Sequence, residues 1–88
     1  MTDAVLIETV GWIGAVLILA AYGLLTAGKL GAESAAYQAM NVVGAVGIGT
    51  ISAWRGVWPS VILNIVWAGI GLVALSRLAL RRRPATAE

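Results

Sequence analysis

The sequence contains no cysteine and no histidine, and only four of its 88 residues are acidic. The lack of cysteine excludes disulfides and thiolate chemistry, and the lack of histidine removes the commonest general base and metal ligand. No phosphate-binding loop and no acid pair within an apolar segment are present. We therefore expect no enzymatic activity, no cofactor and no bound metal.

Apolar side chains, by contrast, dominate the composition. Hydrophobic residues make up 60% of the chain and charged residues 11%, with a mean hydropathy of +0.92. A soluble domain of this size has too little interior to bury so much apolar surface, whereas in a bilayer such side chains face lipid. The composition therefore predicts a single-domain, multi-pass integral membrane protein, expected in the cell (inner) membrane.

The apolar residues fall into three segments, at about residues 5–27, 35–54 and 59–80. Each is long enough to cross a hydrocarbon core of ~30 Å, and lipid leaves helix as the only state that satisfies the backbone. The connections are short, so neighbouring helices run antiparallel. The predicted fold is an all-α membrane protein: an antiparallel bundle of three transmembrane helices over residues 1–80, followed by a polar, basic tail at 81–88.

Local signals mark the ends of these segments. Gly28 and Gly31 follow the first segment and favour a helix end, while Ser34 is placed to cap the second helix. Pro59 suits the first turn of the third helix, where its missing N–H costs no hydrogen bond.

The basic residues predict the orientation. Lys29, Arg77 and the three arginines at 81–83 fall on one side of the membrane, and Arg55 alone falls on the other. Positive residues favour the cytoplasmic side, so the N-terminus is expected outside and the C-terminus in the cytoplasm. The arginine run is interpreted as a topology signal that also meets anionic lipid. Nothing around it suggests nucleic-acid binding.

Polar and aromatic residues recur at steps of three and four along each segment, which keeps them on one helix face. Such groups turn away from lipid, so the three stripes are expected to face one another. They act either as hydrogen-bond glue between helices, worth about 1 kcal/mol each, or as the lining of a solute path. The candidate solute-binding residues are Tyr22, Gln38 and Asn41 toward the cytoplasmic end, and Trp12, Asn64 and Trp67 toward the outer half.

Two further features keep alternatives open. Glycine accounts for 11 residues and clusters in all three segments. These small residues allow helices to pack closely, either within one subunit or at a dimer interface. Glu8 is either a helix-start acid in the headgroup region or a carboxylate that binds a proton or cation, and no partner for it is evident.

Several short motifs resemble a known family. They are Gly11-Trp12-x-Gly14-Ala15, Tyr37-Gln38-x-x-Asn41-x-x-Gly44-Ala45 and Asn64-x-x-Trp67. Over residues 11–75 the pattern resembles small bacterial three-helix membrane proteins of unassigned function, labelled a CBU-like domain. More remotely, the three-span plan looks like the SemiSWEET sugar transporters and other PQ-loop proteins. That resemblance implies a homodimer, with Asn64 and Trp67 as counterparts of the solute-binding residues. The Pro-Gln pair of that superfamily is absent, and Ala21-Tyr22 stands in its place.

Two functions follow as expectations. The first is a homodimeric, SemiSWEET-like transporter of a small uncharged solute, because three helices alone enclose only side chains and a path must run between subunits. The second is a membrane interaction protein that docks to a larger complex without moving solute. In both cases the surrounding partner is membrane lipid.

Overall fold

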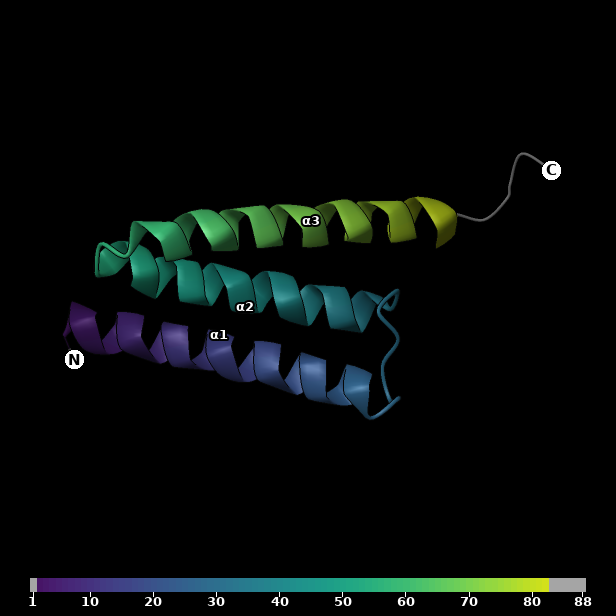
Figure 1. Ribbon diagram of the computed structural model, residues 1–88, viewed down its shortest axis with the longest axis horizontal. Helices are drawn as coiled ribbons and strands as arrows, with labels where there is room; N and C mark the ends of the chain where they lie inside the picture. Colours follow the sequence, from purple (N-terminus) through teal and green to yellow (C-terminus); the bar gives the residue numbers. More distant parts are fainter. Residues whose placement is uncertain (1, 83–88) are drawn as a thin grey trace.

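The computed structural model describes residues 2–82 and contains three α-helices. Successive helices run in opposite directions, and the two connections lie at opposite ends of the layer (Figure 1). The predicted all-helical, antiparallel fold is confirmed. The third helix continues into the predicted tail, whose last residues, 83–88, lie outside the described part of the chain. The helices are α1 (Asp3–Thr26), α2 (Ala35–Trp54) and α3 (Trp58–Arg82).

Side-chain caps start the first two helices. The hydroxyl of Thr2 accepts a hydrogen bond from the Val5 N–H at 3.2 Å, and the hydroxyl of Ser34 accepts one from the Tyr37 N–H at 3.1 Å. Each cap satisfies a donor that the first helical turn leaves without a partner. The predicted role of Ser34 is therefore confirmed.

Glycines end the same two helices. Gly28 and Gly56 both adopt positive φ, 78° and 71°, a conformation that glycine reaches without steric cost. The following N–H then folds back: Lys29 N donates to Leu24 O at 2.9 Å, and Val57 N donates to Ser52 O at 2.8 Å. These are Schellman closures, and they turn the chain sharply enough for the next helix to pack against the last.

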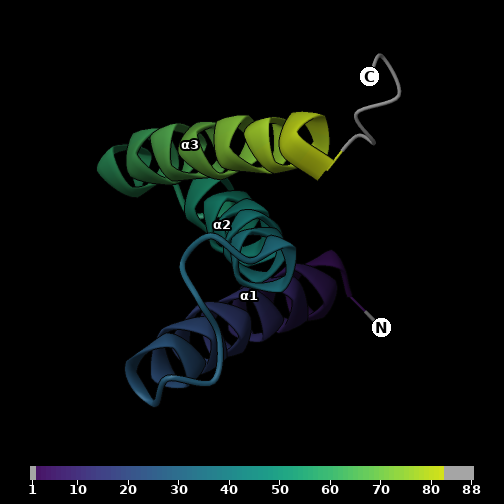
Figure 2. The same cartoon turned by 90° about the vertical axis from the view of Figure 1, so that its right-hand side faces the viewer.

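The helices form an open layer, not the closed bundle that the sequence predicts. α2 lies between α1 and α3, and within the described residues α1 and α3 do not touch (Figures 1 and 2). The reason lies on α2, where Gly44 and Gly47 face α1 while Val42 and Gly49 face α3. Val42 lies two positions before Gly44, and Gly49 lies two positions after Gly47. Two positions turn a helix by roughly 200°, so the face toward α1 and the face toward α3 point away from each other.

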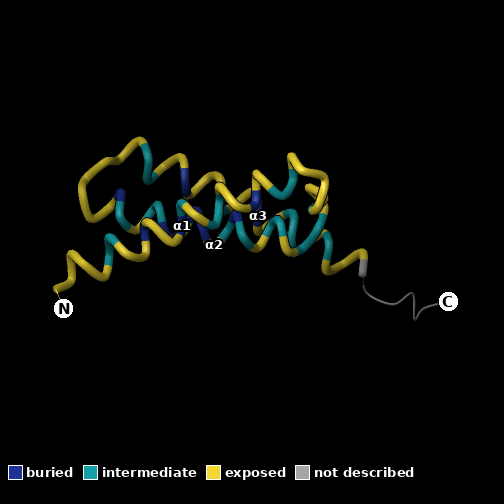
Figure 3. Tube along the Cα trace, turned by 90° about the horizontal axis from the view of Figure 1, so that it is seen from below, coloured by how far each residue is buried: buried dark blue, intermediate teal, exposed yellow. Residues whose placement is uncertain are grey.

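Small and polar residues occupy the two seams, and large apolar side chains point outward. Within residues 2–82 no large side chain is fully buried, whereas Leu19 is 70% exposed and Ile70 is 66% exposed. Figure 3 shows the same distribution, with buried positions confined to short stretches of each helix. The buried residues are Gly11, Gly14, Ala21, Asn41, Gly44, Ala45, Gly47, Ser52, Asn64 and Gly71.

By length and composition, α1 and α3 are apolar enough to cross a membrane. Only 17% of the apolar stretch of α1 and 6% of that of α3 is buried, whereas the core helix of a soluble protein is mostly buried. The middle helix does not reach the same hydropathy, because small residues and the amides Gln38 and Asn41 replace large apolar ones. Of the three predicted spans, length and composition therefore support the first and the third.

Candidate functional site

The buried polar side chains lie along the seam between α2 and α3. Asn41 is 5% exposed, Ser52 7% and Asn64 9%. Burial of an amide or hydroxyl is unfavourable unless it finds a hydrogen-bond partner, so the partners of these groups show what each position does.

Three predicted site residues meet in one open cleft at this seam, which we call the amide cleft. Gln38 and Asn41 line it from the first turns of α2, and Trp67 lines it from the middle of α3. The cleft has a volume of about 180 Å³. Gly71 allows α3 to approach here, because a Cβ at that position would lie 2.5 Å from Cγ2 of Val42. The full lining is Tyr37, Gln38, Asn41, Trp67, Ile70 and Gly71.

The amides of the cleft use their NH₂ groups and leave their oxygens free within residues 2–82. Nδ2 of Asn41 donates to Tyr37 O at 2.8 Å, and Nε2 of Gln38 donates to Ala32 O at 2.8 Å. Both bonds go to backbone carbonyls on or next to α2, so neither ties α2 to α3. Every fully buried side-chain nitrogen or oxygen in the described part of the chain has a hydrogen-bond partner. The two amide oxygens have none, so they are not fully buried and are accessible. They can accept hydrogen bonds from hydroxyl or N–H groups.

Asn64 has a different environment. Its Nδ2 donates to Ser60 O at 2.8 Å and to the Ser60 hydroxyl at 3.3 Å. The Ser60 hydroxyl in turn bonds to that of Ser52 on α2, with the oxygens 2.7 Å apart. The Ser52–Ser60 bond joins α2 to α3 and is typical of interhelical glue, and Asn64, whose own bonds lie within α3, supports it by holding the Ser60 hydroxyl. The open cleft beside Asn64, about 330 Å³, is lined mainly by small and apolar residues such as Ala45 and Ala68.

The two clefts open on opposite sides of the helix layer. On α3 the amide cleft is lined by Trp67 and Ile70, and the cleft beside Asn64 is lined by Ile65 and Ala68. Around the axis of α3, Trp67 lies about 60° to one side of Asn64. Ile65 and Ala68 lie about 100° and 40° to the other side, so the two clefts face different sides of the helix. The two clefts share no residue, so the asparagines do not line one continuous path within a subunit.

The candidates on α1 lie away from both asparagines. Trp12 is 68% exposed and lines a shallow cleft with Ile48 and Ile51 of α2, while Tyr22 is 64% exposed and lines none of the described clefts. The expectation that the stripe of α1 faces that of α2 is therefore wrong. Gly14 occupies the contact instead, because its lack of a side chain gives closer backbone packing, and Trp12, two positions away, is turned outward.

Comparison with known proteins gives a family but no activity. The sequence profile of an uncharacterised protein family matches residues 7–83, nearly the whole of the three helices. The chain belongs to this family. No curated protein and no solved structure matches it. The resemblance to SemiSWEET transporters is not supported by any of these comparisons.

An ion pair that the sequence analysis missed closes one end of the layer. A guanidinium nitrogen of Arg55, at the C-cap of α2, contacts a carboxylate oxygen of Glu8 in α1. Glu8 thus has a partner, contrary to expectation. The two side chains are 57% and 36% exposed, so the pair adds at most about 1 kcal/mol. The predicted topology contained the signal, because it placed both residues on the same side of the membrane.

Three residues that line the amide cleft were not predicted as site residues, and Tyr37 is the polar one among them. It lies one helical turn before Asn41, and the cap at Ser34 fixes its position at the start of α2. The four-residue spacing to Asn41 was the available signal, since residues at that spacing share a helix face.

Proposed function

We propose that all three helices cross the inner membrane, with the N-terminus outside and the C-terminus in the cytoplasm. The outward-facing apolar surface of α1 and α3 supports this placement, because soluble monomers rarely expose contiguous apolar patches of large side chains. α2 crosses between them, and its neighbours cover its glycine face toward α1 and its polar face toward α3. The positive residues Lys29, Arg77 and Arg81 gather at the end that we place in the cytoplasm.

The orientation predicts the behaviour of reporter fusions. A fluorescent protein that matures only in the cytoplasm, fused after Glu88, is expected to fluoresce in intact cells. A periplasm-specific enzyme fused at the same position is expected to be inactive, and exchange of the two signals would reverse the orientation. Carbonate extraction of the same membranes checks insertion separately, since an inserted protein stays in the pellet.

Within the membrane, the protein is proposed to act as a homodimeric transporter of a small uncharged solute. The observation that carries this proposal is the amide cleft: Asn41 and Gln38, whose amide oxygens accept no hydrogen bond within residues 2–82, line the same open space as Trp67. Amide oxygens suit hydroxyl-rich or amide-rich solutes, and an indole packs on the apolar face of such a molecule.

A second copy is needed because the amide cleft is open to one side of the layer. Pairing two subunits about an axis normal to the membrane, with these sides together, would enclose two amide clefts in one cavity. Closed two-fold pairing is the commonest form of oligomer, and transporters place their sites between repeated units. In this arrangement Asn64 lies away from the axis and serves as glue between α2 and α3.

The test has two parts, both on the complete protein in lipid. Mass measurement in nanodiscs is expected to give a dimer. Vesicles containing the parent protein are expected to take up at least one of labelled glycerol, glucose and urea faster than empty vesicles. A strictly monomeric protein, or uptake of all three solutes at the rate of empty vesicles, would overturn the proposal.

A membrane interaction protein is the second candidate, and a specific observation favours it. Gly23 on α1 and Gly69 on α3 lie on open helix faces, where a Cβ would meet no atom within 4 Å. Small residues on an outward face allow another transmembrane helix to approach closely. If the parent protein is monomeric and moves none of the three solutes, docking to a larger membrane complex becomes the better interpretation.

A further inference from the structure

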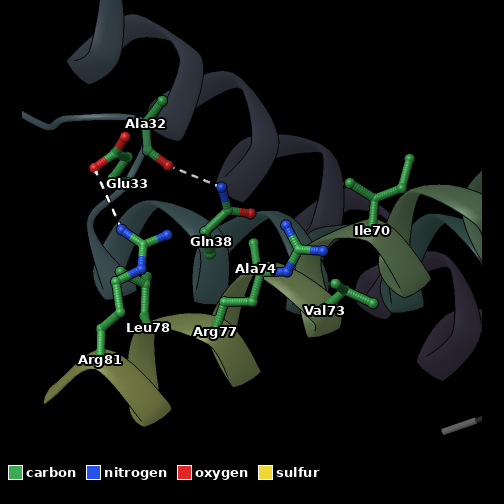
Figure 4. A pocket seen from close by; sticks show the side chains of 9 residues that line it. All are labelled: Ala32, Glu33, Gln38, Ile70, Val73, Ala74, Arg77, Leu78 and Arg81. Carbon is green, nitrogen blue, oxygen red and sulfur yellow. Dashed lines mark hydrogen bonds and ion pairs between the residues drawn. The ribbon is translucent and has the colours of Figure 1, made fainter.

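A further cleft, distinct in its chemistry, lies between the first connection and the C-terminal half of α3. We call it the basic cleft; its volume is about 240 Å³. Arg77 and Arg81 reach into it from α3, and Glu33 borders it from the connection between α1 and α2 (Figure 4). The arginines are four residues apart, so one helix face presents both guanidinium groups to the same space.

The charges of the basic cleft are not balanced within the described residues. Arg81 Nη1 lies 4.0 Å from Glu33 Oε1, at the limit of an ion pair, and the two side chains are 63% and 86% exposed. Arg77 has no acidic partner among residues 2–82. Two guanidinium groups therefore face one loosely held carboxylate, and a phosphate group would complete the site. Guanidinium groups bind phosphate oxygens through paired, charge-assisted hydrogen bonds.

The remainder of the basic cleft is largely apolar and extends along α3. Ile70, Val73 and Leu78 line it, and Ile70 and Gln38 belong also to the amide cleft. The groove thus runs along α3 from the arginines, near the end of the helix, toward its apolar middle. Free inorganic phosphate would occupy only the charged end. A molecule with a phosphate head and a hydrocarbon chain would occupy both parts.

We propose that the basic cleft binds one acidic phospholipid of the surrounding bilayer. The phosphate lies between Arg77 and Arg81, and an acyl chain follows Ile70 and Val73 along α3. A lipid so held covers the charged end of the α2–α3 seam at the membrane surface, next to the amide cleft. The inference rests on the proposed membrane insertion, and its test in detergent does not require solute transport. Because Gln38 and Ile70 line both clefts, the acyl chain ends beside the amide cleft.

Native mass spectrometry of the complete protein in detergent tests this site with dioleoyl-phosphatidylglycerol as the probe. The parent is expected to bind one lipid, and the double variant R77Q/R81Q is expected to bind it at least about tenfold more weakly. Lys29→Gln removes a cation from the same end of the protein but outside the cleft, so its affinity should equal that of the parent. Glu33→Gln removes the competing carboxylate and should tighten binding two- to threefold, by rough estimate.

Two further probes separate the sources of the phosphate. Dioleoyl-phosphatidylcholine and glycerol 3-phosphate are each expected to bind at least tenfold more weakly than phosphatidylglycerol, by rough estimate, because one lacks net negative charge and the other lacks chains. Equal binding of glycerol 3-phosphate would assign the cleft to a soluble phosphate. Equal loss in Lys29→Gln and R77Q/R81Q would show unspecific charge attraction. Either result overturns the proposal, and an R77K/R81K variant with restored binding excludes misfolding as the cause of the loss.

Discussion

Leucine in place of Gly44 or Gly47 is expected to separate α1 from α2 and lower the free energy of unfolding by about 3 kcal/mol or more. A Cβ at Gly44 would lie 2.8 Å from Gly14 O and 2.5 Å from Cγ1 of Ile18. A Cβ at Gly47 would lie 2.8 Å from Val10 O. Backbone oxygens of a helix do not move singly, so α1 as a whole must shift away. The interface with α2 is the only helix–helix interface of α1 within the described residues.

The chain supplies its own matched controls for these substitutions. Gly23 and Gly69 are also helical glycines, but a Cβ at either meets nothing within 4 Å. Leucine at these positions should leave the thermal midpoint in detergent unchanged or slightly higher, because leucine favours helix over glycine by up to about 1 kcal/mol. Midpoints measured by circular dichroism decide the matter. If Gly44→Leu melts together with Gly69→Leu, the close contact between α1 and α2 does not exist.

The sequence predicted the local structure well because local chemistry determines it. The length of the three apolar segments predicted the three helices, the hydroxyl of Ser34 predicted the start of α2, and Gly28 predicted the end of α1. Each of these signals acts within a few residues and does not depend on tertiary packing. The orientation and membrane insertion stay predictions.

The rotation of each helix was the part that the sequence did not determine. In a soluble protein one apolar stripe marks the buried face, but a membrane helix is apolar on nearly every side. Two stripes on α1 then compete for α2: the aromatic stripe that includes Trp12 and the small-residue stripe that includes Gly14. Close backbone packing favours the second. Because the contact face of each helix could not be read from the sequence, a closed bundle was predicted. In the structure α2 presents opposite faces to α1 and α3, which gives an open layer.

Helix rotation also explains which site residues come together. Gln38 and Asn41 share the start of α2, and their proximity follows from sequence spacing alone. Their meeting with Trp67 depends on the register between α2 and α3, which Gly71 permits through its contact with Val42. Asn64, three residues before Trp67, lies on the other side of that contact. Spacing on α3 could not separate these two residues.

The asparagines are accordingly expected to respond differently to the same substitution. Leucine has nearly the shape of asparagine but no polar atoms. In Asn41→Leu the lost hydrogen bond of Nδ2 lies within α2, so the packing of α2 against α3 is retained. What disappears is the accessible amide oxygen of the amide cleft. Uptake of the transported solute should fall at least about tenfold, the equivalent of one lost hydrogen bond of ~1.4 kcal/mol.

Asn64→Leu is expected to give the reverse result. Its Nδ2 bonds to Ser60, whose hydroxyl makes the bond across the seam to Ser52, so removal leaves that hydroxyl without its support and weakens the link between α2 and α3 by up to about 1 kcal/mol. The thermal midpoint should fall while uptake by the folded fraction stays within about twofold of the parent. Uptake in vesicles and melting in detergent, measured on both variants, separate the two roles. If Asn64→Leu reduces uptake as strongly as Asn41→Leu, the path includes both sides of the layer and the glue assignment of Asn64 is wrong.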